Sequence, residues 1–251
     1  MAVYYRTQGF VFKKQDRLEA DRVFSVFTSE FGRLEVFGKA IRKITSKLRG
    51  GIEIFSLSEI EFIQGKNRKT LTDTIIIEKF GNIIQNPGVL EISYKISEVL
   101  DNFIRGEEKD SDIFILLNEI FNKMNNIKLQ TSGIQLIYYY FLWNFLSILG
   151  YYPEIQKCII CRLKLDPKNL FFSNKEGGVV CKNCFNSNMD LKEINSDTIK
   201  ILRLILKKDW KVLSKLKMDI SSQNLLEKVS DDYYNYLLYS HSFINNLREY
   251  I

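Results

Sequence analysis

Four cysteines in two pairs are the residues of this chain best placed to do chemistry. Cys158 and Cys161 are separated by two residues, nineteen residues follow, and Cys181 and Cys184 repeat the same spacing. Two intervening residues let a tight turn bring both sulfurs to one side, and two such turns supply the four tetrahedral ligands of a structural zinc ion. The sequence therefore predicts one structural zinc ion bound by Cys158, Cys161, Cys181 and Cys184.

Two other uses of the cysteines are weighed against zinc. Two disulfides would suit a secreted protein, but the N-terminal segment from Met1 to Arg6 has neither the apolar run nor the cleavage signature of a signal peptide. A redox C-x-x-C pair is expected beside a βαβ unit, and this chain has one pair too many. A four-thiolate site has no open coordination position, so we expect the zinc ion to stabilise the fold and not to catalyse a reaction. Because the cysteines must stay reduced to bind zinc, we expect the protein in the cytoplasm.

The rest of the chain offers few groups for catalysis. The single histidine, His241, has no cluster of acidic residues near it in the sequence. The segment Gly32–Lys39 resembles a phosphate-binding loop, but five residues rather than four separate Gly32 from Gly38, and the segment falls on a predicted strand. We therefore expect a protein that is not an enzyme.

Basic side chains gather in the N-terminal third. The chain of 251 residues has a net charge of +6, and residues 1–80 contain fifteen Lys and Arg against ten Asp and Glu. Two acid-poor segments there are predicted to contact a phosphate backbone, because loops on a rigid barrel commonly carry binding residues. The alternative is a pair of solvated loops that keep the protein soluble. The predicted DNA-binding residues are Lys39, Arg42, Lys43, Lys47, Arg49, Lys66, Arg68 and Lys69.

The segments that must position these loops have β character. Five runs rich in β-forming residues predict a small barrel of the OB-fold type: 4–13, 22–28, 33–37, 52–63 and 71–78. Alternation over the third run separates Leu34 from Phe37 unless a bulge occurs near Gly38. Eight aromatic residues could stack on bases, although most are expected in the barrel core: Tyr4, Tyr5, Phe10, Phe12, Phe24, Phe27, Phe31 and Phe37.

Helical periodicity begins near residue 88 and resumes after the cysteines. The sequence therefore predicts an α+β protein: an OB-fold-like nucleic-acid-binding domain (1–80), a C-terminal helical domain (81–150 and 191–251), and an inserted zinc module (151–190) with a hairpin over 170–180. The apolar run 134–149 is shorter than the roughly twenty residues that span a membrane. We expect it to be a buried helix, and no membrane association.

Three segments resemble the RecO family of bacterial recombination mediators. The first contains Thr28 and, after three residues, Gly32-Arg33-Leu34. The second is the basic stretch Gly38–Lys43, followed by Ser46–Gly50. The third runs from Leu149-Gly150 and Pro153 through the two cysteine pairs, with Phe172 and Gly177-Gly178 between them. Arg162 stands where the family commonly has glycine.

This resemblance implies an ATP-independent mediator of DNA repair and recombination. Such proteins bind single- and double-stranded DNA, anneal complementary strands, and act with RecR to load RecA onto DNA coated by single-strand binding protein. The resemblance also implies binding of the acidic C-terminal tail of single-strand binding protein, which we expect on the helical domain. The RecA filament is expected as an indirect partner. The alternative is an RNA- or ribosome-associated zinc-ribbon/OB-fold protein, and a third class is a scaffold whose barrel binds only protein.

Overall fold

The structure, a computed structural model, describes residues 3–127 and 131–248, without the side chains of 131, 132 and 241–248. The chain divides into two compact units, Met1–Ile137 and Tyr138–Ile251. The predicted domain limits near residues 80, 150 and 190 remain predictions.

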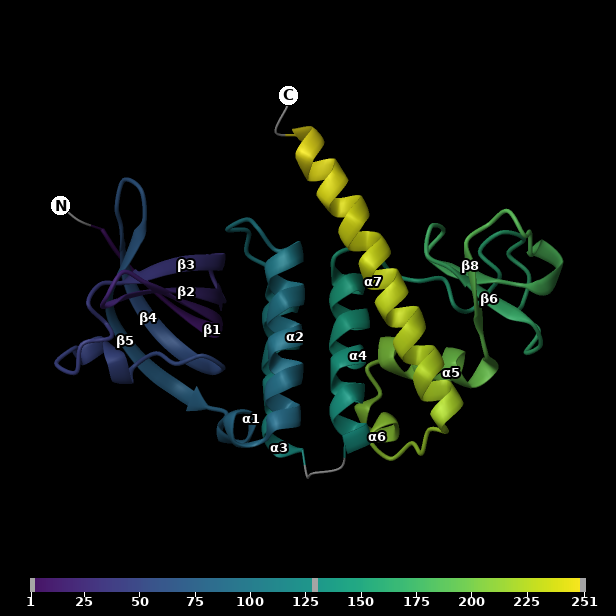
Figure 1. The fold of residues 1–251 in the computed structure, drawn as a ribbon, viewed down its shortest axis with the longest axis horizontal. Coiled ribbons are helices and arrows are strands. Elements are labelled where there is room, and N and C mark those ends of the chain that lie inside the picture. Colours follow the sequence, from purple (N-terminus) through teal and green to yellow (C-terminus); the bar gives the residue numbers. More distant parts are fainter. Residues whose placement is uncertain (1–2, 128–130, 249–251) are drawn as a thin grey trace. The chain divides into compact units, whose positions relative to one another are not determined.

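The first unit contains a closed five-stranded barrel with the strand order β1-β2-β3-β5-β4. Its strands are β1 (Tyr4–Arg17), β2 (Asp21–Thr28), β3 (Gly32–Gly38), β4 (Ser56–Gln64) and β5 (Lys69–Lys79) (Figure 1). Neighbouring strands are antiparallel except β3 and β5, which are parallel. This five-stranded closure confirms the predicted OB-fold-like barrel.

Alternation along β3 decides which side chains face solvent. Leu34 and Val36 are fully buried in the barrel core, whereas Glu35 is exposed and Phe37 is half-buried on the outer face. The pairing of β2 with β3 is continuous from Thr28 opposite Gly32 to Arg22 opposite Gly38. The alternative of a bulge near Gly38 is therefore excluded, and Phe37 points away from the core.

The segment between β3 and β4 folds back onto the barrel. Its Ile41 and Ile52 are buried in the barrel core, and a 3-10 helix covers Lys47–Gly50. The strand predicted from Ile52 begins only at Ser56. Phe55 has a φ of 58°, which an extended strand does not permit, so residues 52–55 lead into the strand without belonging to it.

Three helices complete the first unit: α1 (Gly81–Gln85), α2 (Pro87–Phe103) and α3 (Ser111–Asn126). Asn86 caps α2, since its side chain accepts hydrogen bonds from the N–H groups of Gly88 and Val89. Asp110 caps α3 in the same way. These caps satisfy backbone N–H groups in the first turns of both helices.

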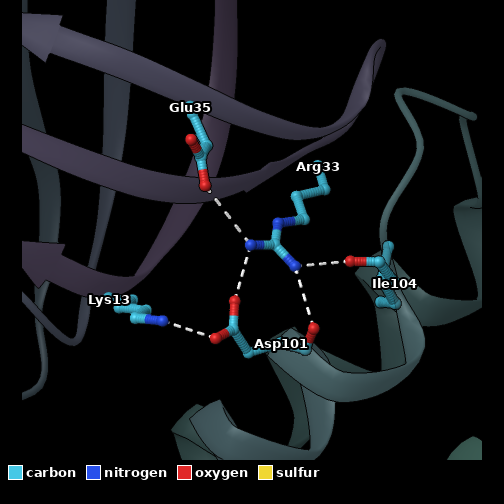
Figure 2. Close-up of polar contacts among 5 residues, drawn as sticks. All are labelled: Lys13, Arg33, Glu35, Asp101 and Ile104. Atoms are coloured by element: carbon cyan, nitrogen blue, oxygen red, sulfur yellow. Dashed lines mark hydrogen bonds and ion pairs between the residues drawn. The ribbon is translucent and has the colours of Figure 1, made fainter. Parts of the chain in front are cut away.

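A polar cluster joins the barrel to the C-terminal end of α2 (Figure 2). The Arg33 guanidinium donates to the carbonyl oxygens of Asp101 (3.1 Å) and Ile104 (2.5 Å) and to the Asp101 carboxylate (2.5 Å). Lys13 contacts the second carboxylate oxygen, and Glu35 lies 3.4 Å from Arg33. The last carbonyls of a helix lack intrahelical partners, so Arg33 supplies donors where α2 needs them.

The second unit combines helices with a three-stranded sheet of order β7-β6-β8. The helices are α4 (Thr131–Ile148), which begins in the first unit, α5 (Ser196–Leu206), α6 (Trp210–Leu213) and α7 (Ile220–Arg248). The strands are β6 (Leu170–Ser173), β7 (Gly178–Val180) and β8 (Leu191–Ile194). The predicted hairpin is confirmed as β6 and β7, whereas β8 was not predicted. No described helix has both the length and the apolar character needed to cross a bilayer.

Aromatic packing fixes the sheet of the second unit on its helices. Trp143 of α4 stacks on Tyr233 of α7 with ring centroids 5.2 Å apart, and its indole N–H donates to Ser230 (2.8 Å). Phe172 of β6 contacts both rings edge-on, at 5.9 and 5.5 Å. β6 is therefore anchored on α4 and α7, and it pairs with β7, the strand that leads into the second cysteine pair.

Candidate functional site

Two backbone turns present the cysteines. In the first, the N–H of Cys158 donates to Leu163 O and the N–H of Arg162 donates to Cys158 O, both at 2.9 Å. Arg162 closes this turn with a φ of 62°. The second turn follows β7 as a short 3-10 helix, Lys182–Cys184, in which the N–H of Cys184 donates to Cys181 O at 3.0 Å. The C-x-x-C spacing therefore folds into two tight turns, as predicted.

The four sulfurs converge on one point. Every pair of Sγ atoms lies within 4.8 Å, and those of Cys161 and Cys181 are 3.8 Å apart. Four sulfurs placed tetrahedrally at about 2.3 Å from a metal are separated by about 3.8 Å, so this donor set fits a four-thiolate site. None of the four cysteines forms a disulfide. Within the described ranges, this is the one cluster of His, Cys, Asp or Glu side chains that fits a metal ion.

The surroundings of the sulfurs favour unequal protonation. Burial disfavours the Cys158 thiolate, but N–H groups of Cys181, Cys161 and Ile160 donate to it and lower its pKa to about 6. The opposite holds for Cys184, where hydrogen bonding with Cys161, together with desolvation, raises the pKa to about 12. A metal ion that binds all four as thiolates must therefore displace protons.

The three loops at one end of the barrel carry most of its predicted DNA contacts. Gly38, at the end of β3, lies opposite Arg22, at the start of β2, and β5 begins beside the end of β3 with Lys69 next to Val36. The β1–β2 turn, the segment after β3 and the β4–β5 turn therefore all start from the same end. This register brings together two basic segments that the sequence separates.

The segment after β3 is held in place by backbone contacts. The N–H of Ala40 donates to the Asp21 carboxylate (2.7 Å), and the N–H of Arg42 donates to Ala20 O (2.9 Å). The predicted contacts in this segment have exposed side chains, and these are Lys39, Arg42, Lys43, Lys47 and Arg49. An ordered backbone with exposed cations suits a surface for a polyanion.

Three arginines line a pocket of about 250 Å³ beside this segment, together with Phe24, Ile41 and Ile52. They are Arg22, Arg42 and Arg49, and we call this the arginine pocket. Asp16 lies 2.7 Å from the Nε of Arg22 and 3.5 Å from that of Arg42. The hydrogen bond from Arg22 lowers the pKa of Asp16 below its ordinary value. Arg22 was missed by sequence reasoning, since only the folded segment brings it beside Arg42 and Arg49.

The β4–β5 turn places its three predicted contacts differently. Lys66 and Arg68 are exposed, and the Arg68 guanidinium lies 3.9 Å from the centroid of the Phe37 ring. Lys69 is only 14% exposed and forms an ion pair with Glu107. Lys66 and Arg68 are thus the more exposed cations of this turn, and a DNA contact of Lys69 stays a prediction.

The side chain of His241 lies outside the described residues, although its backbone belongs to α7. The expectation that it is not catalytic therefore stays a prediction.

Comparison with known proteins identifies two matching family profiles. Residues 1–80 match the profile described as recombination protein O N terminal, and residues 92–243 match recombination protein O C terminal. The chain is 30% identical over 215 residues to the DNA repair protein RecO of Dehalococcoides mccartyi strain BAV1, covering 86% of this chain and 83% of that protein. It is 26% identical to the DNA repair protein RecO of Thermoanaerobacter sp. strain X514 over 247 residues, which are 97% of this chain and 98% of that protein.

Proposed function

The chain belongs to the recombination protein O family, and we propose that it acts in DNA repair and recombination as a mediator without catalytic turnover. In this proposal it binds single- and double-stranded DNA, anneals complementary strands independently of ATP, and helps RecA load onto DNA coated by single-strand binding protein. The observation that carries the proposal is the arginine pocket, which lies at the end of the OB-fold barrel that carries the β1–β2 turn and the segment after β3.

The arginine pocket has the chemistry of a phosphate site. A guanidinium group presents a fork of N–H donors that matches two phosphate oxygens, and Arg22, Arg42 and Arg49 supply three such groups. Asp16 is the anion that contacts two of them, Arg22 and Arg42. A phosphate would take over those contacts, while Lys39, Lys43 and Lys47 extend the positive surface along the strand.

Charge neutralisation is the proposed mechanism of annealing. Two complementary strands repel each other through their phosphates, and a basic surface that holds both lowers this repulsion. Binding of this kind weakens steeply with salt, because each phosphate contact releases condensed counterions.

We propose that the second unit binds the partner proteins. The acidic tail of single-strand binding protein needs apolar contacts next to cations, and the segment from the end of α5 to the start of α7 offers both. Val212, Leu216 and Ile220 are exposed there, at 45%, 39% and 76%. The exposed lysines of this segment are Lys207, Lys208, Lys211, Lys215 and Lys217. RecR is the second proposed partner, and the RecA filament is reached only through the DNA.

We propose zinc as the ion of the four-cysteine site. Four thiolates with tetrahedral spacing favour zinc, which would hold the two turns together and stabilise the module. Cys158, Cys161, Cys181 and Cys184 would all be ligands, so no open position remains for catalysis. We also propose a cytoplasmic location, which is supported by four cysteines that form no disulfide.

The proposal is tested by annealing of complementary strands coated with single-strand binding protein. The wild type is compared with Arg42→Ala/Lys43→Ala/Lys47→Ala and with a control that removes the same charge from the zinc module, Lys164→Ala/Lys168→Ala/Lys175→Ala. We expect the first triple variant to lose annealing and the control to keep it, with equal zinc contents. Equal annealing by both variants would contradict the proposed DNA surface.

The alternative is an RNA- or ribosome-associated role, since an OB-fold with a zinc module also suits RNA. Competition between RNA and DNA oligonucleotides of equal length and sequence separates the two. Tighter binding of DNA, or equal binding together with annealing of DNA, supports the mediator. Tight RNA binding without annealing of DNA supports the alternative. A scaffold whose barrel binds only protein predicts no salt-dependent binding of either.

A further inference from the structure

Phe37 differs in burial from the phenylalanines of β1 and β2. Phe10, Phe12, Phe24 and Phe27 are buried. Phe37 instead lies half-buried on the outer face of β3, directly opposite Val23 of β2 and beside Thr70 of β5. Side chains paired in register share one face of a sheet, so Val23 and Phe37 form an apolar strip on the outer wall.

A pocket of about 350 Å³ opens over this strip, and we call it the Phe37 pocket. It is lined by Arg17, Leu18, Val23, Glu35, Phe37 and Arg68. Leu18 stands in the β1–β2 turn, 87% exposed and with a φ of 50°. A large apolar side chain held exposed in a left-handed conformation contributes nothing evident to the barrel, and such outliers often mark a binding site.

The lining combines flat, apolar and cationic groups. The Phe37 ring and the Arg68 guanidinium lie 3.9 Å apart, so two planar groups are already placed against each other. Both kinds of plane stack on nucleobases. Glu35 adds a carboxylate, which repels phosphate but tolerates a neutral base. This pocket therefore differs from the arginine pocket, which is lined by three arginines, two of them paired with Asp16, and has no exposed apolar side chain.

We propose that the Phe37 pocket holds one unpaired nucleobase of the bound strand, stacked on the Arg68 guanidinium that lies over the Phe37 ring. This inference rests on the proposed function, and it adds a base contact to the phosphate contacts proposed above. The OB-fold supports it, because the face of strands 2 and 3 and the adjoining loops commonly bind oligonucleotides.

The two pockets lie on opposite sides of one strand. Arg22 and Val23 are consecutive in β2, and consecutive strand residues point to opposite faces. A single strand that crosses this edge can place a phosphate beside Arg22 and a base beside Val23. A paired base is stacked within its duplex and does not reach the pocket, so the base contact favours single strands.

Abasic DNA separates the base contact from the phosphate contacts. An abasic oligonucleotide of equal length keeps every phosphate and has no base to stack. Affinities for it and for the ordinary single strand are measured with the wild type, Phe37→Ala and a control on the outer barrel wall, Ile75→Ala, whose side chain is 59% exposed outside the pocket. Phe37→Trp restores an aromatic plane and adds a fluorescent reporter.

We expect Phe37→Ala to bind the ordinary strand on the order of tenfold more weakly, with no change for the abasic strand and no effect of Ile75→Ala on either. Phe37→Trp restores the affinity, and its emission changes with the ordinary strand alone. An equal loss of affinity for both strands, or for neither, overturns the inference. If neither strand bound to the wild type in a salt-dependent way, the proposed function itself would fail, which is a different result.

Discussion

The Arg33 guanidinium lies 2.5 Å from the Asp101 carboxylate and joins β3 of the barrel to the end of α2. Both side chains are mostly buried, at 12% and 26% exposure. Arg33 also donates to two carbonyls of α2, so its removal leaves a helix end without donors. Arg33 of the Thr28 to Leu34 motif thus has a structural role, since it anchors the barrel to α2 within the first unit.

Removal of the Asp101 charge should destabilise the first unit. We expect Asp101→Asn to lower the free energy of unfolding by about 1.5–3 kcal/mol, the range for hydrogen bonds to charged groups. Glu35→Gln is the matched control, because Glu35 contacts the same Arg33 but is 63% exposed and screened by water. Urea denaturation measures both, and equal effects would contradict the anchoring role.

The Asp101 contribution should depend on pH. Partial burial opposes ionisation, but the hydrogen bond from Lys13 and the charge of Arg33 lower the pKa of Asp101 below its ordinary value. A carboxyl whose pKa is lower in the folded state stabilises the protein above its unfolded pKa of about 3.9. The difference in the free energy of unfolding between wild type and Asp101→Asn should therefore be largest at neutral pH and decrease as the pH falls below about 4. A difference that stays constant down to pH 3 would contradict this.

Gly32 should tolerate no side chain. Its φ is 64°, and a Cβ added there would lie 2.0 Å from the carbonyl oxygen of Glu108. We expect Gly32→Ala to lower the free energy of unfolding by at least about 2 kcal/mol, through backbone strain and displacement of the Glu108 loop. Gly50→Ala is the control, since an added Cβ there meets nothing within 4 Å. Similar stabilities of the two variants would show that the contact with Glu108 is dispensable.

The first cysteine turn should gain from a glycine at position 162. Arg162 holds a φ of 62°, which costs an L-residue about 1–2 kcal/mol, and its ion pair with Glu154 is long (4.0 Å) and exposed. Arg162→Gly relieves the strain but raises the conformational entropy of the unfolded chain. We therefore expect the free energy of unfolding to increase by about 0.5 kcal/mol. Arg162→Ala removes the side chain without relieving the strain and should show no gain. Competition with a chelator and thermal unfolding measure both variants.

Removal of the metal should loosen the cysteine module before the barrel. We expect purified protein to contain about one zinc ion per chain, and chelation to disorder the turns that the metal joins. Trp143 reports this change, because its ring contacts Phe172 of β6. Near-UV circular dichroism of the chelated protein and of Cys161→Ser should lose the same aromatic signal. Folded, zinc-free protein with paired cysteines would contradict the zinc assignment.

Local patterns in the sequence predicted those parts of the structure that local chemistry determines. The cysteine spacing predicted two turns and one four-sulfur cluster, and β-rich runs predicted five strands. The role of Arg22 could not be predicted, because it depends on a segment that folds back to place Arg42 and Arg49 beside it. The ion pair of Lys69 with Glu107, thirty-eight residues away, could not be predicted either. Long-range partners of this kind leave no mark in a single sequence.

The salt dependence of single-strand binding tests the central claim most directly. Affinity is measured across salt concentrations for the wild type, for Arg22→Ala/Arg42→Ala/Arg49→Ala, and for the Lys164/Lys168/Lys175 triple-alanine control. If the arginine pocket holds phosphate, the arginine variant binds more weakly, and its slope of log affinity against log salt is flatter by at least about 0.7, the value for one phosphate contact. The control should keep the wild-type slope. An unchanged affinity and slope in the arginine variant would contradict the claim that this end of the barrel binds DNA.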